Sequence, residues 1–250
     1  MFGFIKPRTL SHSLLSAGIL FLLIIHAPAS RAALTVGATR IVFDSEKRST
    51  AVIVSNPSNR TFAVQTWVNT ETDDATTAVP FIASPPLFRL DPAREQQVQI
   101  NGLPNNMPRD RESLFYFNVQ EIPQVQDSEG NVLNVALRTR LKFFYRPAEL
   151  KDNPASRLKD LEWSLTHTGG KPHLTVTNPT PFHVSFARLE VTDGGRKEKL
   201  QNAAMVGPFM SRSYPLANLK ASPGLRVMFT AINDYGGQTR PLDSPIQINP

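Results

Sequence analysis

The chain has 250 residues and a formal net charge of +6 at pH 7, and it contains no cysteine. The absence of cysteine excludes disulfide scaffolds, thiolate catalysis and cysteine-ligated metals, so the fold must be held by a hydrophobic core. Lys6, Arg8 and Arg31 all precede the first acidic residue, so the charge of the remaining chain is modest. A small positive excess of this kind gives no indication of a nucleic-acid partner.

The N-terminus has the composition of a secretory signal peptide. Lys6 and Arg8 form a basic start, an apolar run covers residues 14–27, and Ser30 and Ala32 are small residues at the positions read by a signal peptidase. The apolar run is shorter than the roughly 20 residues that span a bilayer, which disfavours the alternative of a membrane anchor. We predict that residues 1–32 are a signal peptide and that the chain is exported.

The exported part consists of short apolar runs separated by turn residues, which predicts an all-β protein. Gly37 lies within the first run as a bulge or bend, and we expect Trp67 in the core. Pro85 and Pro86 exclude a central strand at their position and mark an edge or a change of sheet, and the sequence leaves open whether either is cis. The runs before residue 131 cover residues 34–43, 51–55, 62–68, 81–90, 97–100 and 114–119.

The pattern begins again after Pro147. Residues 148–156 contain few apolar side chains and predict a linker or corner. Because short strands at 8–12-residue spacing with turn signals are typical of sandwiches, we predict two β-sandwich domains, at residues 33–150 and 151–250. The expected strands of the second domain cover residues 161–165, 174–177, 184–191, 203–206, 225–232 and 246–248.

The stretch from Asn131 to Pro147 is the most informative one. Apolar and polar side chains alternate through it, with Leu133, Val135 and Leu137 on one face, which predicts a strand on the order of 40 Å long at about 3.3 Å per residue. A strand longer than its own sandwich exposes an edge that can pair with another chain. Two interpretations remain open: an edge strand covered by a loop of its own domain, or an edge that a second protein completes.

No enzyme motif is present in the sequence. There is no nucleophile elbow, phosphate-binding loop, dinucleotide fingerprint or zinc-protease helix motif. His167, His173 and His183 fall on separate predicted strands, without the convergent spacing of a metal site, and are interpreted as surface or packing residues. We therefore predict a binding protein with no catalytic residue, no metal and no cofactor.

Five charged residues interrupt or end apolar runs. Buried charges must be paired, so Glu112 and Asp234 are expected to form an ion network with Arg146 across the domain junction. Arg40 and Lys142 are then left without a partner. Two unpaired cations in a partly dry site would bind a carboxylate.

Four stretches of the sequence resemble the periplasmic pilus-assembly chaperones of the chaperone–usher pathway, and the resemblance extends over the chain after the signal peptide. The matching stretches are Arg109-Asp110-Arg111-Glu112-Ser113-Leu114-Phe115-Tyr116-Phe117-Asn118, Leu141 to Pro147, Asn178-Pro179-Thr180-Pro181-Phe182 and Ile232-Asn233-Asp234-Tyr235-Gly236-Gly237. The resemblance implies two immunoglobulin-like β-sandwich domains in a boomerang arrangement and a periplasmic location. The absence of cysteine and the short loop at residues 124–130 resemble the family's short-loop branch, which builds rod pili or fimbriae.

The resemblance also implies roles for particular residues. Arg40 and Lys142 would anchor the C-terminal carboxylate of a pilin subunit, and Leu133, Val135 and Leu137 would fill the subunit's groove by donor-strand complementation. The implied interdomain network consists of Glu112, Arg146 and Asp234, and the surface at Pro86 and Arg89 would contribute to docking on the outer-membrane usher.

The implied partners are pilin or fimbrial subunits and the usher, with no nucleic acid and no stable membrane insertion. The sequence leaves open whether the free protein covers its edge by forming a homodimer. The alternatives are a secreted immunoglobulin-like adhesion or carbohydrate-binding protein, and a periplasmic hydrolase. By strict alternation Lys142 faces away from Leu133, Val135 and Leu137, so either a twist or bulge redirects it, or the carboxylate approaches from the opposite face.

Overall fold

The computed structural model describes residues 34–74, 76–122, 136–219 and 224–248. The predicted signal peptide and the positions Leu133 and Val135 lie outside these residues. Within them the regular secondary structure is β-strand apart from one 3₁₀ helix, and the chain forms two hydrophobic cores, one before and one after the linker at Pro147. No helix in the described ranges is long and apolar enough to cross a membrane.

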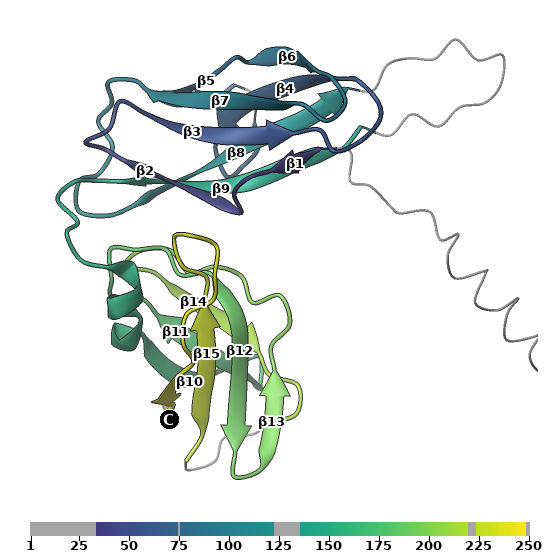
Figure 1. Ribbon diagram of the computed structural model, residues 1–250. Helices are drawn as coiled ribbons and strands as arrows, with labels where there is room; N and C mark the ends of the chain where they lie inside the picture. Colours follow the sequence, from purple (N-terminus) through teal and green to yellow (C-terminus); the bar gives the residue numbers. More distant parts are fainter. Residues whose placement is uncertain (1–33, 75, 123–135, 220–223, 249–250) are drawn as a thin grey trace, which may run out of the picture. The chain divides into compact units, whose positions relative to one another are not determined.

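The N-terminal sandwich consists of a four-stranded and a five-stranded sheet (Figure 1). The order of the first is β1 (Thr35–Val36), β3 (Ser49–Ser55), β7 (Glu95–Gly102) and β5 (Phe81–Ser84). The order of the second is β2 (Arg40–Asp44), β9 (Arg138–Arg146), β8 (Ser113–Ile122), β4 (Phe62–Asn69) and β6 (Leu87–Leu90).

Two breaks in the sequence pattern move the chain from one sheet to the other. The first predicted run divides near Gly37 into β1 and β2, which belong to different sheets. The second change occurs at Pro85 and Pro86, where β5 ends and β6 begins in the opposite sheet, so the predicted change of sheet is correct. The Ser84–Pro85 peptide bond is cis.

An aromatic cluster fills the N-terminal core. Phe43, Phe81 and Phe143 are buried, with ring centroids 5.3 Å apart for Phe43 and Phe81 and 4.7 Å apart for Phe81 and Phe143. The expectation that Trp67 lies in this core is wrong. The buried face of β4 carries Phe62, Val64 and Val68, so Trp67 faces outward, where the Arg138 guanidinium lies 4.7 Å from its ring centroid.

Strand β9 is shorter than the sequence indicates, and only its first half lies at an edge of the sheet. It begins at Arg138, and Ala136 and Leu137 are described outside the strand, while residues 131–135 lie outside the described ranges. Its partner β8 ends at Ile122, and alternation along one strand does not show where the partner ends. β9 also lies inside its sheet, because β2 pairs with it in parallel from Lys142 onward.

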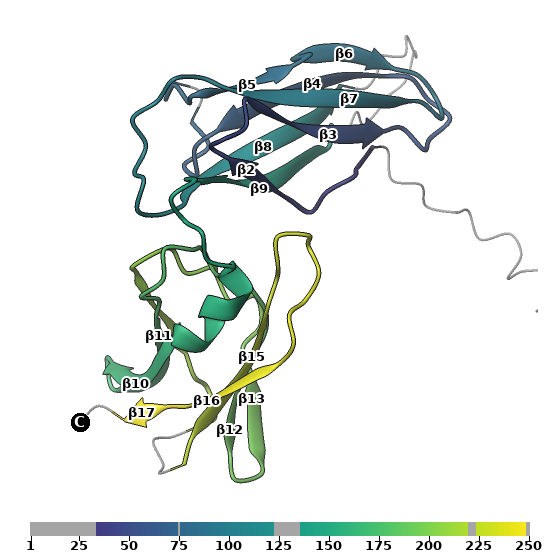
Figure 2. The same ribbon diagram turned by 60° about the vertical axis from the view of Figure 1, so that its left-hand side comes forward.

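The C-terminal sandwich consists of two four-stranded sheets (Figure 2). One has the order β14 (Ser211–Pro215), β11 (Lys171–Thr177), β10 (Glu162–Thr168) and β17 (Gln247–Ile248), and the other β13 (Arg196–Lys199), β12 (Phe186–Asp193), β15 (Arg226–Ala231) and β16 (Leu242–Pro245). The predicted linker runs into a 3₁₀ helix, η1 (Pro154–Asp160), whose first turn is capped by Asn153. The strand expected at residues 203–206 is only an isolated bridge between Val184 and Val206.

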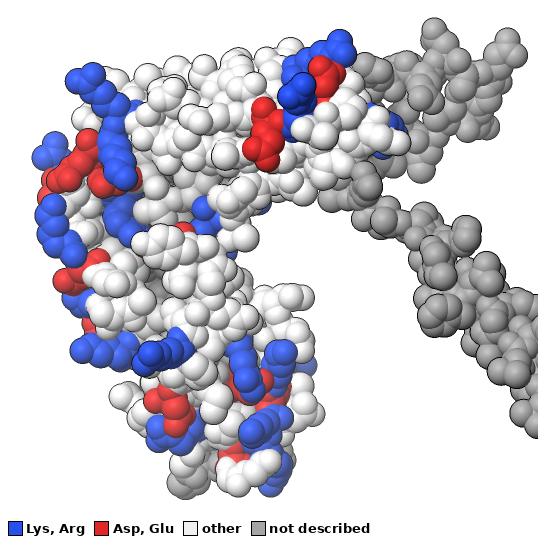
Figure 3. Space-filling model, viewed as in Figure 1, with Lys and Arg blue, Asp and Glu red and all other residues white. Residues whose placement is uncertain are grey.

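Charge is unevenly distributed over the surface. In Figure 3 the exposed face of the sheet containing β3 and β7 is largely uncharged, whereas lysine, arginine and acidic side chains alternate over the C-terminal sandwich. The charges on this sandwich include exposed ion pairs such as Arg226 of β15 with Asp243 of β16, at 2.8 Å. Exposed pairs of this kind contribute little to stability.

Replacing Phe143 with alanine should lower the free energy of unfolding of the N-terminal sandwich by about 3–5 kcal/mol, because a fully buried ring is removed from a packed cluster. Urea unfolding followed by the fluorescence of Trp67, in a Trp163→Phe background, measures this. Ile82→Ala is the matched control, since Ile82 is 52% exposed and should change stability by no more than about 0.5 kcal/mol. Equal effects of both substitutions would contradict the assigned core.

Candidate functional site

Arg40 and Lys142 are neighbours across two paired strands. The parallel pairing of β2 with β9 places Arg40 opposite Lys142. The ladder between β8 and β9 is continuous from Ser113↔Tyr145 to Gln120↔Arg138, so no bulge redirects Lys142. Lys142 therefore lies on the face opposite to the buried Leu141 and Phe143. Of the two explanations for its orientation, approach from that outer face is the one that the geometry favours.

The C-terminal sandwich supplies an acceptor to each of these two cations. Lys142 Nζ donates to Ser185 Oγ at 3.0 Å, and an Arg40 terminal nitrogen donates to the Ile232 carbonyl at 2.9 Å. The Ile232 amide in turn donates to the Ser185 carbonyl at 2.9 Å, so the two acceptors are themselves joined. Sequence reasoning missed Ser185 and Ile232, because a single hydroxyl and a backbone carbonyl leave no pattern in the sequence.

Neither cation forms an ion pair within the described residues. Burial lowers the pKa of Arg40, although the negative charges of Asp234 and Glu112 act to raise it. Burial also lowers the pKa of Lys142, and the neighbouring charge of Arg40 lowers it further. The buried Nε of Arg40 has no hydrogen-bond partner. Two partly desolvated cations that lie together and form no ion pair can stabilise a bound carboxylate by charge-assisted hydrogen bonds.

The predicted ion network forms beside this pair. Arg146 donates to both carboxylate oxygens of Asp234, at 2.7 and 2.8 Å, and its Nε donates to Glu112 Oε1 at 2.8 Å. Burial alone would lower the pKa of Arg146, but its hydrogen bonds and ion pairs with Asp234 and Glu112 outweigh burial and raise it. The network joins the end of β9 to the loop after β15. It lines a cavity of about 390 Å³, to which Arg40 also contributes.

His183 is a further member of the network that sequence reasoning assigned to the surface or to packing. Its backbone amide donates to Glu112 Oε2 at 2.8 Å, and its Nδ1 lies 3.1 Å from the same oxygen. The Glu112 amide donates to the Pro181 carbonyl at 2.9 Å. Glu112 is therefore held by both sandwiches. The only available signal was that His183 directly follows the motif ending at Phe182.

The first half of β9 has a free edge within the part of the chain that the structure describes. The Leu137 carbonyl accepts from the Glu121 amide on the β8 side, and the Arg146 carbonyl accepts from the Ser45 amide on the β2 side. By the alternation of a ladder, the backbone groups of Arg138 and Arg140 then point to the side of β2. Because β2 begins only opposite Lys142, no described strand pairs with them. Leu137, at the start of this edge, is 55% exposed.

The surface at the double proline is exposed and partly apolar. Pro86 and Leu87 are exposed, Leu87 at 59%, and the neighbouring Ile122 is 41% exposed. Arg89 is exposed and forms an ion pair with Asp91 at 2.8 Å. This surface lies on β6 and β8, on a different part of the sheet from Arg40 and Lys142.

The described residues hold no group of three or more histidine or acidic side chains that could bind a metal ion. The features on which a site can be built are therefore the two cations, their acceptors and the free edge.

The fold defines a class of all-β proteins made of two immunoglobulin-like sandwiches, and comparison with known proteins defines the family within it. Residues 33–151 match the N-terminal domain of the PapD pili and flagellar-assembly chaperones, and residues 156–242 match the C-terminal domain of the PapD pili assembly chaperones. The chain belongs to this family of fimbrial and pilus assembly chaperones of the chaperone–usher type. Its relatives are chaperones, which supports the expectation that it is not an enzyme.

Individual relatives are similar over most of their length. The chain is 36% identical to the probable fimbrial chaperone YadV of Escherichia coli K12, over 84% of this chain and 88% of the relative. It is 34% identical to the chaperone PapD of Escherichia coli, over 83% and 84%. The crystal structure of YadV superposes with a TM-score of 0.75 at 33% identity, covering 86% and 100% of the two chains. The SafB chaperone, solved in complex with the SafA pilin of Salmonella enterica, gives a TM-score of 0.73 at 29% identity, covering 87% and 98%.

Replacing Arg146 with alanine should lower the free energy of unfolding by about 3–5 kcal/mol, because Glu112 is left buried without its counter-ion. Chemical denaturation measures the change. Arg226→Ala removes an arginine from a pair in which both side chains are about half exposed, and should change stability by no more than about 1 kcal/mol. A neutral effect of Arg146→Ala would show that the network does not hold the two sandwiches.

Proposed function

We propose that this protein is a periplasmic chaperone that completes the fold of a pilin subunit by pairing with it along β9, anchors the subunit's C-terminal carboxylate on Arg40 and Lys142, and delivers it to the outer-membrane usher. One observation carries the proposal: the free edge of β9 ends at two half-buried cations that form no ion pair within the described residues. Membership of the pilus assembly chaperones supports the same assignment.

The direction of the added strand follows from the pairing of β2. A pilin strand at the free edge would lie in line with β2, on the same side of β9. The free edge covers the start of β9, and Arg40 and Lys142 lie further along it, where β2 begins. A strand whose last residue reaches these cations must therefore run in the same direction as β9. The bound strand is therefore parallel to β9. Its backbone pairs with Arg138 and Arg140, whose groups point to that side.

Apolar side chains on the donor segment would supply most of the binding free energy. Each buried leucine or valine contributes roughly 1.5–3 kcal/mol. We assign this role to Leu133, Val135 and Leu137, of which Leu137 is described and is exposed in the free protein. The carboxylate anchor fixes the register, because a slip of one residue would turn the opposite face of the strand into the groove.

Delivery to the usher would use a different surface of the N-terminal sandwich. Pro86 and Arg89 belong to the exposed, partly apolar patch that also includes Leu87 and Ile122. This patch stays accessible when a pilin occupies the edge of β9, because β6 lies at the other end of the five-stranded sheet. A chaperone can therefore hold a subunit and dock at the same time.

Arg40→Ala and Lys142→Ala should each abolish recovery of a pilin subunit co-expressed in the periplasm, because the carboxylate loses a charge-assisted partner in a poorly solvated site. Affinity capture of the chaperone measures the recovered pilin. Arg196→Ala and Lys197→Ala, exposed cations on β13, are matched controls and should leave recovery unchanged. Normal recovery with both anchor variants would contradict the carboxylate site.

Leu137→Asp should prevent pilin recovery without unfolding the chaperone, because the side chain is exposed in the free protein and would be buried in the complex. The control is Ile82→Asp, an equally exposed apolar residue on β5 of the other sheet. Circular dichroism confirms folding, and affinity capture measures the pilin. If both aspartate variants recover the pilin equally well, the donor segment has been assigned wrongly.

A further inference from the structure

Gly236 is in closer contact with the N-terminal sandwich than any side chain at its position would allow. It belongs to the loop after β15, and a Cβ atom added to it would overlap Thr39 Oγ1 and lie 3.3 Å from Thr39 Cβ. Its φ of +85° also favours glycine. Rotating the Thr39 side chain would remove only the first of these contacts. A residue other than glycine would therefore push the loop away from Thr39.

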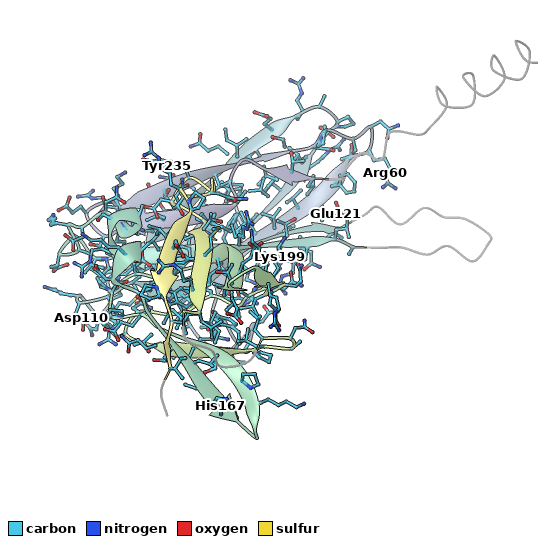
Figure 4. The ribbon with its side chains drawn as sticks, turned by 90° about the horizontal axis from the view of Figure 1, so that it is seen from below. Arg60, Asp110, Glu121, His167, Lys199 and Tyr235 are labelled. Carbon is cyan, nitrogen blue, oxygen red and sulfur yellow. The ribbon has the colours of Figure 1, made fainter. Side chains whose placement is uncertain are left out.

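The loop that carries Gly236 is held in its conformation by hydrogen bonds between its own residues. Ile232 and Gln238 form a bridge across its base, and the Asn233 side chain accepts from the amides of Tyr235 and Gly237, at 3.0 and 2.9 Å. The Gly236 amide donates to the Asn233 carbonyl at 3.0 Å. Tyr235, labelled in Figure 4, is 97% exposed and adds no packing of its own. A displacement at Gly236 is therefore transmitted along the loop instead of being absorbed within it.

The two segments that meet at this contact, one at Thr39 and one in the loop of Gly236, are both connected to Arg40. Thr39 is the residue directly before Arg40 in the chain, and Ile232, at the base of the loop, supplies the carbonyl that accepts from the Arg40 guanidinium at 2.9 Å. Arg40 starts β2 and lies opposite Lys142. The separation between Thr39 and Gly236 therefore sets the position of the Arg40 side chain relative to its acceptor.

We infer that Gly236 is a positioning residue for the carboxylate anchor: its lack of a side chain lets the C-terminal sandwich approach Thr39 closely enough to hold Arg40 on the Ile232 carbonyl. The inference rests on the proposed function for the ligand, a C-terminal carboxylate. The inference adds Gly236 to the proposed site as a residue that does not itself contact the carboxylate. The anchor is then complete only when the loop of the C-terminal sandwich is seated against Thr39.

Two substitutions separate the contact from backbone strain. Gly236→Ala introduces a Cβ and is strained at positive φ, whereas Gly236→Asn introduces a Cβ at a φ that asparagine tolerates better. Gly170→Ala is the matched control, because Gly170 has a φ of +76° and nothing lies within 4 Å of its added Cβ. Thr39→Ala in the Gly236→Ala background removes Oγ1 but keeps Cβ, and should restore part of the wild-type behaviour.

The first readout needs no pilin. The buried Arg40 Nε–H gives a ¹H–¹⁵N signal that should shift in Gly236→Ala and Gly236→Asn and stay unchanged in Gly170→Ala. In the Thr39→Ala double variant it should move back toward its wild-type position. If Gly236→Ala does not fold, Thr39→Val crowds the same contact from the other side and should shift the same signal. An unshifted Arg40 signal in the Gly236 variants overturns the inference.

The second readout uses a synthetic peptide with the C-terminal sequence of a pilin that co-purifies with the chaperone, made as the free acid and as the amide. The wild type should prefer the acid, and in Gly236→Ala this preference should fall about tenfold or more, as for one lost hydrogen bond to a charged group. A preference retained in Gly236→Ala overturns the inference. No preference in the wild type contradicts the proposed function instead, and the Arg40 signal then decides the inference alone.

Discussion

The hydrogen-bonded ion network at Arg146 is the interaction on which the rest of the site depends. Arg146 ends β9 in one sandwich, and its partner Asp234 follows β15 in the other. The loop that carries Asp234 begins at Ile232, whose carbonyl holds Arg40. Because Glu112 is buried, the network is costly to break from either side, and it keeps the C-terminal acceptors next to the N-terminal cations.

With that junction fixed, Arg40 and Lys142 remain partly buried without an ion-pair partner among the described residues. The Ser185 hydroxyl accepts a hydrogen bond from Lys142 and the Ile232 carbonyl accepts one from Arg40, and burial lowers the pKa of both cations. Such an arrangement is unfavourable in the free protein, and the proposed carboxylate would relieve it. The free edge of β9 leads directly to this point. In the proposed function a bound strand would therefore pair its backbone with β9 and place its carboxylate between Lys142 of β9 and Arg40 of β2.

The sequence predicted the strands whose apolar pattern is strong and missed those whose pattern is weak. The alternation of β4 and the double proline between β5 and β6 were sufficient to place a strand and a change of sheet, whereas β13, with the sequence Arg196 to Lys199, carries almost no apolar signal. Trp67 was expected in the core as an aromatic residue of a well-alternating run, although the alternation of β4 places it on the outer face. The sequence indicates a member of the site only where a charged side chain contributes to it. Arg40, Lys142, Glu112, Arg146 and Asp234 could therefore be named in advance, while a backbone carbonyl and a serine hydroxyl could not.

The account is tested most directly by amide hydrogen exchange on β9, measured by NMR on the free protein and on its complex with a pilin subunit. The amides of Arg138 and Arg140 point to the free edge and should exchange markedly more slowly in the complex. The amide of Thr139 already faces β8 and should change little. If Arg138 and Arg140 exchange equally fast with and without the pilin, no strand is added at this edge and the account is wrong.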